Sequence, residues 1–230
     1  MNRLFLLLLL LLLPNIVLAQ TPSEQELLGQ FDQIKHPDFV LIENTHTSKD
    51  GIYLRKEAYS QFKLMADAAQ KEGLNLQIIS ATRNFNYQKG IWERKWERSK
   101  YMGWDAFKKA DDILNYSSMP GSSRHHWGTD IDLNSLNNDF FASGDGLKLY
   151  EWLSVNGPTF GFYQVYTSKE AGRTGYNEEK WHWSYLPLAK GYLIAFNELV
   201  HPENINGFKG STLVDTLQII PNYVNGIHYY

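Results

Sequence analysis

The feature that most constrains this 230-residue chain is the complete absence of cysteine. No disulfide framework can hold the fold together, no thiolate can bind a metal, and no cysteine can act as a nucleophile. A zinc site in this chain would therefore need histidine, aspartate or glutamate ligands. The formal charge of −3 offers no strong field for nucleic acid or an acidic membrane surface, so we expect neither as a partner.

The N-terminus has the pattern of a secretory signal peptide. Arg3 supplies a positive charge, ten apolar residues run from Leu4 to Leu13, and Val17 and Ala19 suit the −3 and −1 positions of a cleavage site. A membrane anchor is the alternative, but a bilayer-spanning helix needs about 20 apolar residues. We expect cleavage after residue 19, no stable membrane anchor, and a periplasmic or secreted protein. Export without cysteine is typical of a bacterial envelope.

Hydrophobic periodicity predicts a single α+β domain. We expect helices over residues 55–72, 87–98, 105–116, 147–155 and 186–199, and strands over residues 74–79, 129–133, 160–166 and 180–185. The predicted organisation is a signal peptide (1–19), a loose polar leader (20–54), the main domain (55–199) and a C-terminal extension (200–230). The charged stretch 93–100 is interpreted as a solvent-exposed helix face.

Residues that could carry chemistry gather in two short segments. They are His125, Asp130 and Asp132 in residues 123–132, and Glu179 and His182 in residues 179–183. Because side chains alternate along a strand, Asp130 and Asp132 are expected on one face, and His182 can point into the same cleft. Two carboxylates on one face of an apolar strand need a positive partner, which a zinc ion or Arg83 would supply.

The combination of His125, Asp132 and His182 is typical of a catalytic zinc site with one open position. Glu179 would act as general base on the zinc-bound water, and Arg83 would stabilise the oxyanion formed at the attacked carbonyl. On this interpretation Glu179 lies in a loop or bend, because its position has the wrong parity for the face that carries His182.

Each of these residues has a structural alternative. His126 is expected to lie behind the ligands or at the surface, because its side chain diverges from that of its neighbour. Arg83 could form a buried ion pair with Asp130 instead of serving catalysis. Glu178 is the rival to Glu179 as the base, with an exposed loop position as its expected place.

The two segments and one upstream pair resemble the motifs of a known family. Residues 123–132 fit Ser-x-His-x-x-Gly-x-x-x-Asp, residues 179–182 fit Glu-x-x-His, and Arg83 is followed five residues later by Gln88. Together, and in this order, they are similar to the M15 zinc D-alanyl-D-alanine carboxypeptidases, which include VanY-type enzymes and the related VanX-type dipeptidases. The resemblance implies the fold shared with the hedgehog N-terminal domain: a small antiparallel sheet with helices packed on it.

The resemblance also implies roles for individual residues. His125, Asp132 and His182 match the ligands of one zinc ion, Glu179 matches the base, and Arg83 matches the arginine that binds substrate or transition state. Ser123 and Gln88 match residues that line the substrate site. Asp130 departs from the family pattern, which usually has alanine there, so it could orient a ligand or bind an amino group of the substrate.

Three functions follow from this resemblance. The first is hydrolysis of the terminal D-Ala-D-Ala bond of peptidoglycan stem peptides through a zinc-bound water. The second is a D,D-dipeptidase or peptidoglycan endopeptidase with the same site, and the third is a zinc-containing binding module without turnover. Release of free D-alanine from a pentapeptide distinguishes the first from the others, and the sequence leaves the oligomeric state open.

Overall fold

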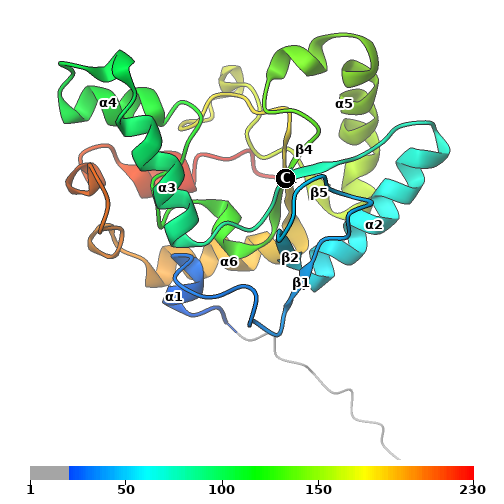
Figure 1. Cartoon of the computed structure of the whole chain (residues 1–230), viewed down its shortest axis with the longest axis horizontal. Helices are drawn as coiled ribbons and strands as arrows, with labels where there is room; N and C mark the ends of the chain where they lie inside the picture. Colours follow the sequence, from blue (N-terminus) through cyan, green and yellow to red (C-terminus); the bar gives the residue numbers. More distant parts are fainter. Residues whose placement is uncertain (1–20) are drawn as a thin grey trace, which may run out of the picture.

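The structure, a computed structural model, describes residues 21–230, and the predicted signal peptide at residues 1–19 lies outside the described part (Figure 1). The helices are α1 (Glu24–Leu27), α2 (Lys56–Lys71), α3 (Phe85–Trp96), α4 (Ala106–Ile113), α5 (Gly144–Asn156) and α6 (Leu186–Leu199). The strands are β1 (Phe39–Leu41), β2 (Tyr53–Arg55), β3 (Ile78–Ser80), β4 (Asp130–Leu133), β5 (Phe162–Tyr163) and β6 (His182–Tyr185).

A small antiparallel sheet lies at the centre of the molecule. Its strand order is β3-β4-β6-β5, so β4 and β6 are the two inner strands, and β1 and β2 form a separate antiparallel pair. In Figure 1, α2 and α5 lie on one side of the sheet and α3 and α4 on the other. The predicted α+β fold with helices packed on small antiparallel sheets is confirmed.

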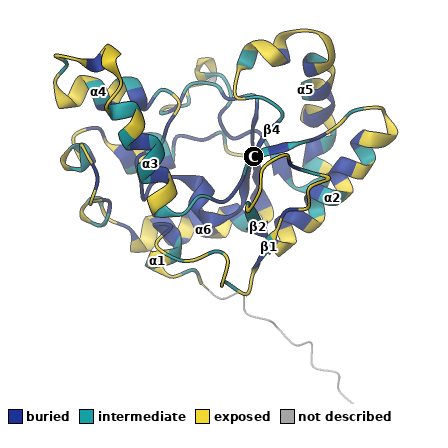
Figure 2. Ribbon diagram, in the orientation of Figure 1, coloured by how far each residue is buried: buried dark blue, intermediate teal, exposed yellow. Residues whose placement is uncertain are grey.

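One hydrophobic cluster fills the space between the sheet, α2 and α5. Ile131 and Leu133 of β4 project into it, together with Phe62 of α2 and Leu153 of α5, and all four side chains are fully buried. All residues of the inner strands β4 and β6 are buried, and β4 is dark blue in Figure 2, so both faces of these two strands are covered. The apolar residues of β4 face this cluster, and its alternate residues face the functional site.

A second hydrophobic cluster joins α6 to both ends of the described chain. Leu27 of α1, Trp92 of α3, Phe196 of α6, and Ile219 and Val224 near the C-terminus are all fully buried in it. Residues of the expected leader and of the expected C-terminal extension thus contribute to the same core as the main domain. Their burial indicates that residues 21–54 and 200–230 help to stabilise the fold.

The strands of the central sheet are shorter than the sequence predicts. Only residues 78 and 79 of the expected strand 74–79 belong to β3, and the Asn134 side chain binds the backbone of the residues before this strand. Its side chain accepts from the Gln77 N–H at 3.1 Å and donates to the Asn75 carbonyl at 2.8 Å. The expected strand 160–166 is likewise reduced to Phe162–Tyr163.

The helices agree more closely with prediction, and their starts are set by caps. α3 begins two residues earlier than expected because Asn84 accepts the Tyr87 N–H, and Asp105 caps α4 in the same way through Lys108. Within residues 21–230, none of the helices has both the length and the apolar character needed to cross a membrane.

Candidate active site

A tight turn after Ser123 positions the first histidine. Residues Arg124–Trp127 form a single 3-10 turn that ends at Gly128, whose φ of 71° lies in the left-handed region. A Cβ atom on Gly128 would come within 2.3 Å of the Phe39 ring, so glycine is required both for this backbone angle and for this close approach. The turn leaves the His125 side chain 3% exposed and directed toward β4.

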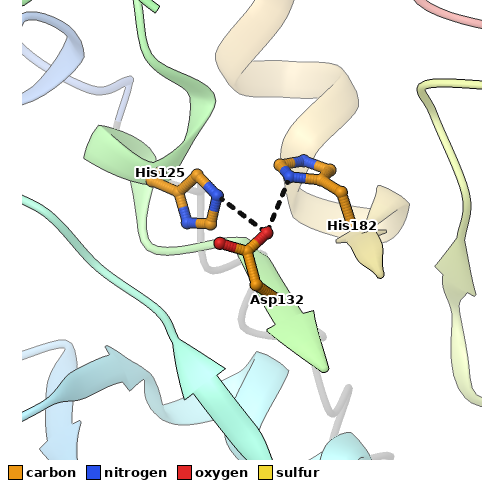
Figure 3. Close-up of side chains that lie close together, drawn as sticks. All are labelled: His125, Asp132 and His182. Atoms are coloured by element: carbon orange, nitrogen blue, oxygen red, sulfur yellow. Dashed lines mark hydrogen bonds and ion pairs between the residues drawn. The ribbon is translucent and has the colours of Figure 1, made fainter. Parts of the chain in front are cut away.

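The inner strands bring the other two residues together. In the register of β4 and β6, Asp132 lies directly opposite His182, and Asp130 lies opposite Ser184. Asp132 Oδ1 is 3.2 Å from His182 Nδ1 and 3.4 Å from His125 Nε2 (Figure 3). One ligand atom from each of the three residues lies within 4.8 Å of the others, as a shared metal ion would require.

The two ring nitrogens of His125 have different surroundings. Its Nδ1 lies 2.8 Å from the Ala81 carbonyl, an acceptor that requires the proton on Nδ1. Its buried Nε2 has no hydrogen-bond partner within residues 21–230 and faces Asp132. Burial and the nearby Arg83 guanidinium lower the pKa of His125. A neutral imidazole with a free Nε2 lone pair fits a metal ligand.

In the metal-free protein the carboxylates around His182 favour the charged form of this histidine, whereas the surroundings of His125 favour the neutral form. Burial would lower the pKa of His182, but hydrogen bonds to Asp130 and Asp132 outweigh it and raise the pKa to about 9. Burial would raise the pKa of Asp132, but His125 and His182 outweigh this effect and hold the pKa well below the ordinary value. Metal binding at neutral pH would therefore displace a proton from His182.

Glu179 lies next to this set through a turn. The Glu179 carbonyl accepts the His182 N–H at 3.2 Å, and this turn brings the Glu179 carboxylate 3.7 Å from His182 Nδ1. The loop position resolves the parity problem that the sequence posed. Burial raises the pKa of Glu179 to about 7, against the opposing effect of the His182 charge. Glu178 is absent from the cavity lining described below, so Glu179 is the acid of this pair that faces the site.

Two arginines lie beside the carboxylates of β4: Arg83 is near Asp132, and Arg124 pairs with Asp130. Arg83 follows β3, and its Nη2 is 3.9 Å from Asp132 Oδ2. The alternative of a pair between Arg83 and Asp130 is wrong, because Arg124 Nε binds Asp130 Oδ2 at 3.0 Å with both side chains fully buried. The sequence did not predict Arg124 as the partner of Asp130. Residue 124 is one of the unspecified positions of the motif, and it lies in the turn before β4, where the alternation of strand side chains does not apply.

A cavity of about 770 Å³ opens over these residues. Its lining includes Arg83, Ser123, His125, Asp132, Glu179 and His182. Gln88 is not in that lining: its side chain is fully buried, and its amide donates to the Ser118 carbonyl at 2.8 Å. Gln88 instead supports the cavity wall, because Ser118 lines the cavity.

The cavity also contains side chains that the sequence did not single out. Tyr166 packs on the His182 ring at 4.5 Å between centroids, and Tyr176 lies beside it. Lys95 lines the wall and donates to Ser117 Oγ at 2.6 Å, so the interpretation of residues 93–100 as solvent-exposed is wrong for Lys95. Burial, with the nearby Arg98 charge, lowers the pKa of Lys95 to about 8.

His126 takes no part in the ligand set. It is fully buried, its Nε2 accepts the Gly121 N–H at 3.0 Å, and its Nδ1 contacts the Arg83 carbonyl. Burial lowers the pKa of His126 to about 3, so it is a neutral link between the turn and the segment that carries Arg83. Of the two expected places for His126, behind the candidate ligands or at the surface, the surface is excluded by its burial.

Comparison with known proteins identifies the family. The model of the family described as VanY, D-alanyl-D-alanine carboxypeptidase, matches residues 51–188, more than half of the chain. The chain belongs to the VanY family. Membership makes it a hydrolase of the carboxypeptidase type and supports peptidase activity on peptidoglycan.

Two curated relatives show how far the similarity extends. The putative carboxypeptidase YodJ of Bacillus subtilis (strain 168) is 29% identical over 199 residues, which are 83% of this chain and 67% of YodJ. A D-alanyl-D-alanine carboxypeptidase of Enterococcus faecalis (strain ATCC 700802 / V583) is 26% identical over 140 residues. That match covers 61% of this chain and about half, 51%, of the enterococcal protein.

Solved structures support the fold. VanYB in complex with D-Alanine-D-Alanine aligns with a TM-score of 0.55 at 24% identity, over 77% of this VanY-family chain and 90% of VanYB. The LdcB LD-carboxypeptidase aligns with a TM-score of 0.55 at 26% identity, over 75% of this chain and 77% of LdcB. A VanY D,D-pentapeptidase variant in complex with Zn(II) aligns with a TM-score of 0.52 at 24% identity, over 72% and 94%.

Proposed function

We propose that this chain is a zinc D,D-carboxypeptidase that removes the terminal D-alanine from peptidoglycan stem peptides outside the cytoplasmic membrane. The observation that carries the proposal is the buried set of His125, Asp132 and His182 at the base of the cavity, with Glu179 beside it. The VanY family match supports the substrate class. The pattern of a signal peptide at residues 1–19 supports the location, because stem peptides lie outside that membrane.

The three ligands would hold one zinc ion. His125 would bind through Nε2, the nitrogen that has no hydrogen-bond partner in the described structure, and His182 through Nδ1, which faces Asp132. When bound, zinc would polarise the scissile carbonyl and lower the pKa of a coordinated water molecule. Three protein ligands leave one position open, which distinguishes a catalytic from a structural zinc site.

Glu179 would move the protons of the reaction. As a carboxylate it takes a proton from the attacking water, and as an acid it returns that proton to the nitrogen of the leaving D-alanine. Burial raises the pKa of Glu179 to about 7 in the metal-free protein, so the surroundings of this carboxyl accommodate its protonated form. The buried position keeps the carboxylate close to the ligands and limits its exchange with bulk solvent.

Arg83 would stabilise the negative charge that develops on the attacked carbonyl oxygen. Its side chain lines the cavity, and its Nη2 group lies 3.9 Å from Asp132, beside the ligand set. A positive group fixed where the charge forms favours the transition state over the ground state. Ser123, whose buried hydroxyl has no hydrogen-bond partner among residues 21–230, would bind the substrate backbone.

Product analysis on defined substrates tests the proposal. The zinc-loaded mature chain is incubated with a stem pentapeptide ending in D-Ala-D-Ala, a stem tetrapeptide, free D-Ala-D-Ala and a cross-linked muropeptide dimer. Release of one D-alanine from the pentapeptide alone is the expected result. Cleavage of only the free dipeptide, only the tetrapeptide or only the cross-link would instead assign a D,D-dipeptidase, an L,D-carboxypeptidase or an endopeptidase. No cleavage of any substrate would favour a binding module.

A further inference from the structure

Asp130 contacts His182 on the side of the ring opposite the other ligands. His182 Nε2 is 2.8 Å from Asp130 Oδ2, whereas Nδ1 of the same ring is 3.2 Å from Asp132 Oδ1. Asp130 has no exposed surface. Its carboxylate is therefore placed to accept a proton from one nitrogen of His182 while the other nitrogen faces the ligand set.

Every acceptor position of the Asp130 carboxylate is already used. Oδ1 accepts from Thr129 Oγ1 at 2.6 Å and from Ser184 Oγ at 2.8 Å. Oδ2 accepts from Arg124 Nε at 3.0 Å and from His182 Nε2. A carboxylate held by four donors and neutralised by a buried guanidinium has no free oxygen for a metal ion. Asp130 is thus a fixed hydrogen-bond acceptor and not a fourth ligand.

We propose that Asp130 is a positioning residue: it holds the proton of His182 on Nε2 and so reserves the Nδ1 lone pair for the zinc ion. This inference rests on the proposed zinc site. Outer carboxylates that accept the second N–H of a metal-bound histidine fix its tautomer and ring orientation. The two imidazoles of this site are then oriented by different acceptors, His125 by the Ala81 carbonyl and His182 by Asp130.

The arrangement depends on residues that act together. Arg124 supplies the charge that makes a buried Asp130 tolerable, and its Nη2 binds Ser184 Oγ at 2.8 Å. An alanine at position 130 would leave the buried His182 N–H without an acceptor and Arg124 without a counter-ion. Arg124 and Ser184 thus bind the Asp130 carboxylate, and Asp130 makes the hydrogen bond to His182.

The test measures zinc affinity by competition with a chromophoric chelator, so that it does not depend on activity. Asp130→Ala is expected to weaken zinc binding by about 10- to 100-fold. Asp130→Asn is expected to stay within a few-fold of the parent, because its amide oxygen still accepts from His182 and its NH₂ group can donate to the two hydroxyls. Ser184→Ala, which removes one hydrogen bond to Asp130 without touching His182, should also stay within a few-fold.

A second variant covers the case in which Asp130→Ala fails to fold. Arg124→Met combined with Asp130→Ala removes both buried charges and should fold with the same loss of zinc affinity. Parent affinity in the alanine variants would overturn the inference, as would an Asn or Ser184→Ala variant as weak as Asp130→Ala. A parent protein that binds no zinc would instead overturn the proposed function from which the inference starts.

Discussion

Replacing Glu179, the proposed base, should make the metal-free protein more stable at pH 8, and it should remove the activity of the zinc-loaded protein. Glu179 is 7% exposed, and its pKa is raised from the ordinary 4.5 to about 7, chiefly by burial. The folded state binds the proton of Glu179 more tightly than the unfolded state does. Proton binding therefore contributes its full amount to the free energy of unfolding below pH 4.5, and this contribution is lost as pH rises through 7. The loss corresponds to about 3 kcal/mol above pH 7.

Glu179→Gln keeps the shape of the protonated side chain but cannot ionise. The variant and parent should therefore differ little in stability at pH 4, and the variant should be more stable by about 3 kcal/mol at pH 8. For a protein of this size that difference corresponds to a melting temperature higher by about 6 to 12 °C. Thermal unfolding with a chelator present, from pH 4 to pH 8, measures the change.

The matched control is Glu178→Gln, which removes the neighbouring acid without altering the cavity lining. Its stability relative to the parent should change little between pH 4 and pH 8. A Glu179→Gln gain that is absent at pH 8, or equally large at pH 4, would refute the view that burial makes ionisation of Glu179 costly.

Three further results are expected. Metal analysis should find one zinc ion in the parent and in the exposed-site variant His201→Ala, and none in His125→Ala; equal zinc in all three proteins would exclude His125 as a ligand. Arg83→Gln should lower turnover by about 10²- to 10³-fold with zinc content unchanged, and full activity would remove Arg83 from the oxyanion role. Leu27→Ala should reduce the free energy of unfolding by about 2–5 kcal/mol in denaturant titrations, because Leu27 is fully buried. A loss no larger than that of the half-exposed control Leu64→Ala would mean that α1 is not part of the core.

Strand parity was the most informative part of the sequence for the site. Alternation alone placed Asp130 and Asp132 on one face and His182 in the same cleft, and the structure shows Asp132 directly opposite His182. The parity of Glu179 also indicated correctly that it had to lie in a loop. Such predictions succeed because the two-residue period of a strand is a local property of the backbone.

Contacts made by turns and helices could not be predicted in the same way, whether the two partners are near or far along the chain. The partner of Asp130 is Arg124, which lies in a 3-10 turn with no simple side-chain period, and Gln88 turned toward the Ser118 carbonyl instead of the cavity. Lys95 lies among charged residues typical of a surface helix, yet it lines the cavity and its ammonium group donates to Ser117 Oγ. Each depends on how helices and turns pack in three dimensions, which one sequence does not reveal.

The most direct test of the central claim is D-alanine release by zinc-loaded parent, Glu179→Gln and Glu178→Gln proteins from the same stem pentapeptide, with zinc content measured for each. The proposed mechanism predicts that all three hold one zinc ion, that parent and Glu178→Gln release D-alanine at similar rates, and that Glu179→Gln is slower by about 10²- to 10⁴-fold. A Glu179→Gln protein that keeps its zinc and releases D-alanine at the parent rate would contradict it.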